Sequence, residues 1–60
     1  MNEEQAHLLV IDDDQTFNRV LSRALAQRGF TVFSAHDQAQ ALQLADAHEP
    51  EYVVLDLNLD

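Results

Sequence analysis

The sequence predicts an α/β fold in which three strands and two helices alternate as β-α-β-α-β. The segments LLVI, residues 8–11, and YVVLDLNL, residues 52–59, are aliphatic runs typical of strands covered on both faces. Between them lie two stretches with helical spacing of apolar residues, separated by the β-branched and aromatic segment FTVFSA, residues 30–35. Buried strands that alternate with amphipathic helices imply a parallel sheet with right-handed crossovers.

The first predicted helix follows the first strand and ends before Gly29, a residue typical of helix stops. Its polar side carries Arg19 and Arg23, which with Arg28 are expected to form a solvated face. The apolar side is expected to pack on the sheet. Its residues are Phe17, Val20, Leu21, Ala24 and Leu25.

The second predicted helix is QAQALQLADAH, residues 38–48, with Asp37 as its N-cap. We expect this helix to pack on the sheet through Ala41, Leu42 and Ala45. Because proline cannot continue a helix, Pro50 is expected to end this region before the third strand begins.

Charge and composition exclude several classes of function. The chain has 60 residues, with 11 acidic and 3 basic side chains and a formal charge of −8. This charge argues against direct binding of nucleic acid and favours cationic partners or divalent metal. The absence of cysteine excludes disulfides and thiolate metal sites, and it is consistent with a reducing cytoplasm. No apolar run is long enough to span a membrane, and the acidic start MNEEQAH is unlike a signal peptide.

Four acids stand where the first and third predicted strands end. Asp12, Asp13 and Asp14 follow the first strand, and Asp56 lies near the end of the third. In parallel α/β sheets, chemistry takes place beyond the carboxyl ends of the strands, so these acids meet at one edge if the two strands are neighbours. Crowded carboxylates are costly unless a cation lies among them. Oxygen ligands without sulfur suit a hard cation such as Mg²⁺.

The same acids also have structural explanations. Asp14 is expected to be a helix-start acid that the helix dipole favours. Asp12 and Asp13 could do the same, but three acids exceed what the capping of one helix needs. Asp56 lies inside the apolar segment VVLDL, where capping does not explain it, although backbone N–H groups at a strand end could satisfy it.

Three segments, LLVIDDDQ, RGFTV and YVVLDLNL, resemble the first half of a response-regulator receiver domain, the phosphoacceptor module of two-component signalling. The resemblance covers nearly all of the chain from Leu8 onward. Its most specific part is the acid pair after the first strand, combined with an aspartate inside the apolar third strand. It implies that the chain is a β-α-β-α-β fragment of a flavodoxin-like, doubly wound parallel sheet with strand order two-one-three.

The resemblance also implies roles for single residues. Asp12 and Asp13 would hold Mg²⁺, or Mn²⁺ in its place, together with Asp56 and the backbone carbonyl of Asn58. Asp56 would take the phosphoryl group in line from a sensor histidine kinase, in the cytoplasm, to form an acyl phosphate. The chain would thus be a signalling domain in transcription regulation. It would not be an enzyme, because the only reactions it would catalyse are its own phosphorylation and dephosphorylation. Any contact with DNA would come from an output domain outside these residues.

By the same resemblance, residues 1–6 are an N-terminal tail and residues 7–60 are the N-terminal half of a receiver domain, truncated after the third strand. The chain has no lysine, so the family's phosphoryl-pairing lysine, its hydroxyl residue and its aromatic switch residue would lie in the other half. Asp60 stands where family members often have proline. Without the other half, apolar faces of the first and third strands would stay open. The third strand would be a raw edge, so we expect a homo-oligomer.

Rival interpretations remain open at the level of sequence. DDDQT, residues 12–16, also fits the D-x-D-x-T loop of haloacid-dehalogenase-like phosphatases, with Asp12 as nucleophile. However, Gln15 replaces the usual glycine before the threonine, and that class gives no role to Asp56. A dinucleotide-binding half-fold is weaker still, because Gly29 is the only glycine. The last alternative is an interaction fragment with no chemistry of its own.

Overall fold

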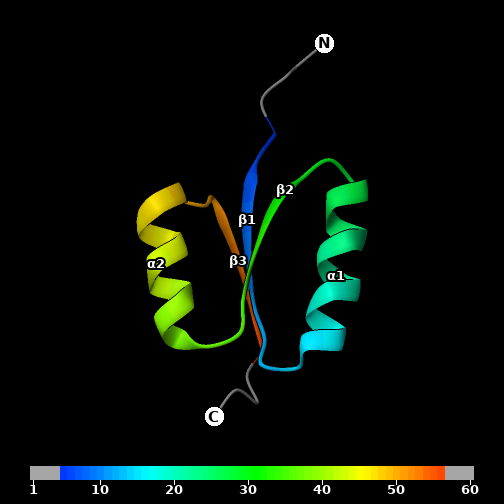
Figure 1. The fold of residues 1–60 in the computed structure, drawn as a ribbon. Coiled ribbons are helices and arrows are strands. Elements are labelled where there is room, and N and C mark those ends of the chain that lie inside the picture. The colour runs from blue at the N-terminus through cyan, green and yellow to red at the C-terminus, as the bar shows by residue number, and fades with distance from the viewer. Residues whose placement is uncertain (1–4, 57–60) are drawn as a thin grey trace.

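Five elements alternate between strand and helix, as the sequence predicts (Figure 1). The computed structural model describes residues 5–56. The sheet has the order β2-β1-β3, and both strand pairs are parallel, which confirms the predicted topology. The two helices lie on opposite faces of this sheet (Figure 1). The elements are β1 (His7–Ile11), α1 (Gln15–Gln27), β2 (Thr31–Ala35), α2 (Gln38–His48) and β3 (Tyr52–Leu55).

Both helices begin at an aspartate N-cap. The side chain of Asp14 accepts a hydrogen bond from the backbone N–H of Phe17 at 3.0 Å, and that of Asp37 accepts one from Gln40 at 2.8 Å. Each carboxylate satisfies an N–H group that has no partner inside its helix. Both predicted caps are therefore confirmed. At the end of α1, Gly29 has φ 103°, a left-handed conformation that glycine adopts without steric cost.

The core is centred on β1, the middle strand of the sheet. Leu8, Leu9 and Val10 are all buried, because strands flank β1 on both sides and a helix covers each face. Leu9 belongs to a cluster with Ala35 of β2 and Ala41 of α2. Partly buried apolar residues pack around this cluster: Ile11, Phe33, Leu44 and Ala45.

The buried face of α1 differs from the predicted one. Asn18 is only 1% exposed, whereas Phe17 is 53% and Val20 61% exposed. The reason is that α1 packs on β1 and β2 and not on β3, so β3 does not cover the side of the helix that carries Phe17 and Val20. Ala24 is exposed as well, while Leu21 and Leu25 are half-buried as expected.

The buried face of α2 also differs in part from the predicted one. Ala41 is buried and Ala45 packs against the core, as predicted, but Leu42 is 72% exposed. Like α1, the helix α2 packs on β1 and β2 and makes no packing contact with β3 within the described residues. The prediction that Leu42 packs on the sheet is therefore wrong. Within residues 5–56, no helix is long and apolar enough to cross a bilayer.

The strand β3 is the open edge of the sheet. All four of its residues, Tyr52–Leu55, are exposed, although they are as apolar as those of β1. This confirms the prediction of an open third strand. The companion prediction, that the first strand also has open faces, is wrong, because β1 is covered by both helices.

Candidate functional site

The sheet register brings the acids of β1 and β3 together. Ile11 is the partner of Leu55 in the parallel ladder, so the next residues, Asp12 and Asp56, leave the sheet side by side. Backbone hydrogen bonds extend the ladders by one step: the Asp56 N–H donates to the Ile11 carbonyl at 3.0 Å, and the Asp12 N–H donates to the Ala35 carbonyl at 3.1 Å. Both acids are thus held at the carboxyl edge of the sheet.

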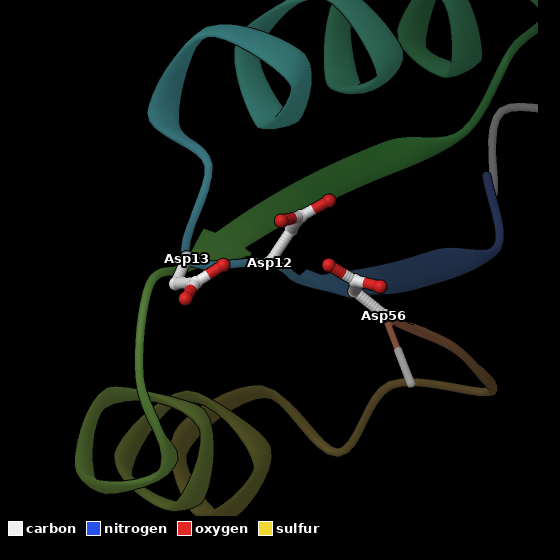
Figure 2. A group of neighbouring side chains, drawn as sticks. All are labelled: Asp12, Asp13 and Asp56. Carbon is white, nitrogen blue, oxygen red and sulfur yellow. The ribbon is translucent and has the colours of Figure 1, made fainter. Parts of the chain in front are cut away.

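Three of the four predicted acids form one cluster. Asp12, Asp13 and Asp56 each contribute a carboxylate oxygen, and these oxygens lie within 4.8 Å of one another. Figure 2 shows the carboxylates of Asp12 and Asp56 beside each other and that of Asp13 close by. The fourth acid, Asp14, caps α1 instead, as predicted. The predicted backbone ligand Asn58 lies outside the described residues.

The three acids differ in their access to solvent. Asp12 is 3% exposed, Asp56 is half-buried and Asp13 is exposed. The backbone N–H of Asp14 donates to Asp12 Oδ1 at 2.9 Å, which orients this buried carboxylate. The cluster thus combines one rigid, desolvated acid with two that open to solvent, where a ligand can approach.

An open hollow adjoins the cluster on the α1 side of the sheet. The buried wall comes from β1, and α1 and β3 supply the flanks. Its lining combines carboxylates with apolar side chains: Val10, Ile11, Asp12, Asp14, Phe17, Leu21, Val54, Leu55 and Asp56.

The donor set fits a hard divalent cation. All three ligand groups are carboxylates, and Mg²⁺ prefers oxygen ligands and usually binds through one or two carboxylates while keeping several waters. Like charges this close repel, and a bound cation removes that repulsion. Among the acidic and histidine side chains of residues 5–56, the three aspartates of this cluster are the group whose spacing suits one bound ion.

Sequence reasoning missed one residue next to the cluster. Asn18 was not singled out, yet its side-chain Nδ2 donates to the carbonyl oxygens of Asp12 at 3.2 Å and Ala35 at 3.0 Å. A signal was present in its spacing, because Leu21, Ser22 and Leu25 lie three, four and seven residues after Asn18 and so share its side of a helix. That spacing marks a second helix face, which proves to be the buried one.

A parallel α/β sheet with helices on both faces belongs to the class of open α/β folds that bind their ligands at the carboxyl ends of the strands. Within this class, the family model for the response regulator receiver domain matches residues 8–60. The chain belongs to this family.

Similar proteins support the same assignment. The photosynthetic apparatus regulatory protein RegA of Rhodovulum sulfidophilum is 42% identical over 57 residues, covering 95% of this chain and 31% of RegA. The transcriptional regulatory protein PrrA of Mycobacterium tuberculosis is 42% identical over 52 residues, covering 87% of this chain and 22% of PrrA. The transcriptional regulatory protein GlrR of Escherichia coli is 32% identical over 60 residues, covering 100% of this chain and 14% of GlrR.

The chain thus spans less than a third of the length of these relatives. No solved structure matches the chain significantly.

Proposed function

We propose that this chain is the phosphoacceptor part of a two-component response regulator, and that Asp56 accepts a phosphoryl group from a sensor histidine kinase. The observation that carries the proposal is the cluster of Asp12, Asp13 and Asp56 within 4.8 Å, at the carboxyl edge of a receiver-family sheet. Asp12, Asp13 and Asp56 would hold Mg²⁺, together with the backbone carbonyl of Asn58.

The proposed step is a substitution at phosphorus. A carboxylate oxygen of Asp56 forms the new O–P bond while the P–N bond of a phosphohistidine breaks. The bond's electron pair stays on the imidazole nitrogen, which takes a proton from solvent. The product on Asp56 is an acyl phosphate. When bound, the divalent cation supplies positive charge that offsets the charge on the phosphoryl oxygens.

The three acids of the cluster would have different roles, because they differ in burial and in hydrogen bonding. Asp12 is buried and held by the Asp14 N–H, so it offers a fixed ligand oxygen. Asp56 is half-buried at the end of β3, which leaves its carboxylate within reach of a donor. Exposed Asp13 completes the ligand set from the solvent side.

The wider assignments belong to the same proposal. Residues 7–60 would be the first half of a receiver domain, residues 1–6 a tail, and the protein a cytoplasmic transcription regulator. Support comes from relatives whose names describe transcriptional regulators and which are more than three times as long as the matched segment. DNA contact would then come from an output domain. The chain would catalyse only its own phosphorylation and dephosphorylation.

Phosphorylation of single variants tests the site. With a small phosphodonor and Mg²⁺, the full-length protein should acquire phosphate that is labile to acid and base, and Asp56→Asn should abolish it. Asp46→Asn is a matched control, because Asp46 lies on α2 outside the cluster. Incorporation that survives Asp56→Asn but disappears in Asp12→Asn would contradict the proposal and favour the phosphatase chemistry instead.

A separate experiment tests the metal. Mn²⁺ broadens the NMR signals of nuclei near its binding site, so titration should selectively broaden the amide signals of residues 12, 13 and 56–58. Broadening that spares these residues would contradict the shared metal site. Weak binding is expected, because Mg²⁺-type sites of few carboxylates retain several waters.

We also propose that residues 1–60 by themselves form a homo-oligomer through β3. Its apolar side chains are exposed, and its backbone edge is a template for pairing with another chain. Charge repulsion between acidic copies opposes this, so salt or Mg²⁺ should promote association. Sedimentation at low and high ionic strength measures it, with Val53→Lys as a variant that should weaken it. A folded, concentration-independent monomer in both conditions would contradict it.

A further inference from the structure

A buried polar residue connects the acidic loop to the rest of the domain. Asn18 is 1% exposed, and it lies on α1 beneath the ends of β1 and β2. Its Nδ2 donates to the carbonyl oxygens of Asp12 and Ala35, at 3.2 and 3.0 Å. The Ala35 carbonyl is the last of β2, and the Asp12 carbonyl belongs to the first residue after β1. One amide group therefore joins α1 to both strand ends.

The orientation of this amide follows from its neighbours. Ser22 Oγ donates to Asn18 Oδ1 at 3.0 Å, which leaves Nδ2 toward the two carbonyls. A flipped amide would place Oδ1 against two carbonyl oxygens, where no proton could be shared. Ser22 Oγ also lies 2.8 Å from Ser34 Oγ. Because the one proton of Ser22 goes to Asn18, Ser34 is the donor in that second hydrogen bond.

The hydrogen bond to the Asp12 carbonyl has a consequence for Asp13. That carbonyl belongs to the peptide plane between the two residues, so holding it restricts the backbone rotation that aims the Asp13 side chain. The other restraints on this loop act elsewhere: the Asp14 N–H binds Asp12 Oδ1, and the Asp12 N–H binds the Ala35 carbonyl. In the described structure, Asn18 is the side chain that holds this peptide.

We propose that Asn18 is a positioning residue, which fixes the Asp12–Asp13 peptide so that both carboxylates point to one ion. This inference rests on the proposed metal-binding function, and it adds a residue that does not itself touch the metal. Outer-shell partners of metal ligands typically change affinity by about 10- to 100-fold when they are removed. Because Asn18 acts through the backbone, we expect about 10-fold, the lower end of that range.

The test is the Asn18→Leu variant of the full-length protein. Leucine has a similar branched shape and suits a buried position, so the domain should remain folded while both Nδ2 donors are lost. We expect Mn²⁺ affinity, measured by NMR line broadening at residues 12, 13 and 56, to fall about 10-fold. Ser22→Ala keeps the Nδ2 donors but frees the amide to turn, so it should cause a smaller fall.

A control separates positioning from loss of stability. Leu44→Ala removes packing on the opposite face of the sheet, away from the acidic loop, and should lower the urea midpoint without changing Mn²⁺ affinity. Affinity that is unchanged in Asn18→Leu would overturn the proposal. So would an equal fall in Leu44→Ala.

A metal-free measurement distinguishes failure of this inference from failure of the proposed function. If the wild-type protein shows no Mn²⁺ broadening at the cluster, the metal site is wrong, whatever Asn18 does. Hydrogen exchange without metal of the Asp14 amide, which donates to Asp12 Oδ1, then decides the positioning role. Faster exchange in Asn18→Leu than in Leu44→Ala supports it, and equal exchange overturns it.

Discussion

Neutralising one carboxylate of the cluster should stabilise the metal-free domain. The Asp56→Asn substitution keeps the shape of the side chain and one of its oxygens, but it removes the charge that faces Asp12 and Asp13. The expected gain is an example of the trade-off between stability and function at functional sites. It follows from the crowding of three like charges at one sheet edge.

The size of the effect follows from the spacing of the cluster. Two unit charges 4.8 Å apart repel by about 0.9 kcal/mol in bulk water and by about 3.5 kcal/mol at an effective dielectric constant of about 20. Asp13 is exposed, so its repulsion lies near the lower value, whereas that of buried Asp12 is larger. Screening by physiological salt reduces both. We therefore expect a gain of about 1–3 kcal/mol in the free energy of unfolding.

Native-state hydrogen exchange of the Leu9 and Val10 amides in EDTA measures this free energy for the core of the domain. Asp46→Asn, which makes the same change in net charge on α2, should have little effect. Added salt should narrow the gap between Asp56→Asn and the wild type. Mg²⁺ at ten times its Kd should stabilise the wild type by about 1.4 kcal/mol, and the variant by less.

Two results would refute this reasoning. The first is a variant that is less stable than the wild type in EDTA, because then the charge of Asp56 contributes more than its repulsion costs. The second is equal stabilisation of both proteins by Mg²⁺, because then the ion does not use this carboxylate. The first result would contradict the repulsion argument, and the second would contradict a shared ion at the cluster.

Three further predictions concern the scaffold that holds the site. Glu49, directly after α2, has φ 49°, a left-handed conformation that is strained for a residue with a side chain. Glu49→Gly should remove this strain and raise the urea midpoint by the equivalent of about 0.5–1 kcal/mol. A lower midpoint would contradict this. Asp37→Ala should cost about 1 kcal/mol, because the Gln40 N–H loses its partner. Asp37→Asn should retain most of the stability, and equal losses in the two variants would rule out capping as the cause. Leu9→Ala should cost about 2–5 kcal/mol by leaving a cavity in the core cluster, and a loss below 1 kcal/mol in thermal or urea unfolding would mean that the sheet collapses around it.

The sequence by itself determined the order of the elements, the two aspartate caps and the position of the acids. These features depend on local chemistry. Aliphatic runs form strands, helical spacing forms amphipathic helices, and aspartate before a helix satisfies free N–H groups. The placement of Asp12 and Asp56 at one edge also followed, once parallel strands were inferred, because their carboxyl ends lie together.

Only the tertiary structure decided which face of each helix is buried. Leu42 and Val20 lie on apolar stripes that the sequence marks clearly, yet both are exposed, while polar Asn18 is buried. The physical reason is that periodicity defines a helix's own surface and carries no information on where its neighbours lie. Both helices pack over β1 and β2, so the faces that turn away from these strands remain open. Asn18 is accepted inside because strand-end carbonyls and a serine hydroxyl complete its hydrogen bonds, and that arrangement exists only when α1, β1 and β2 meet.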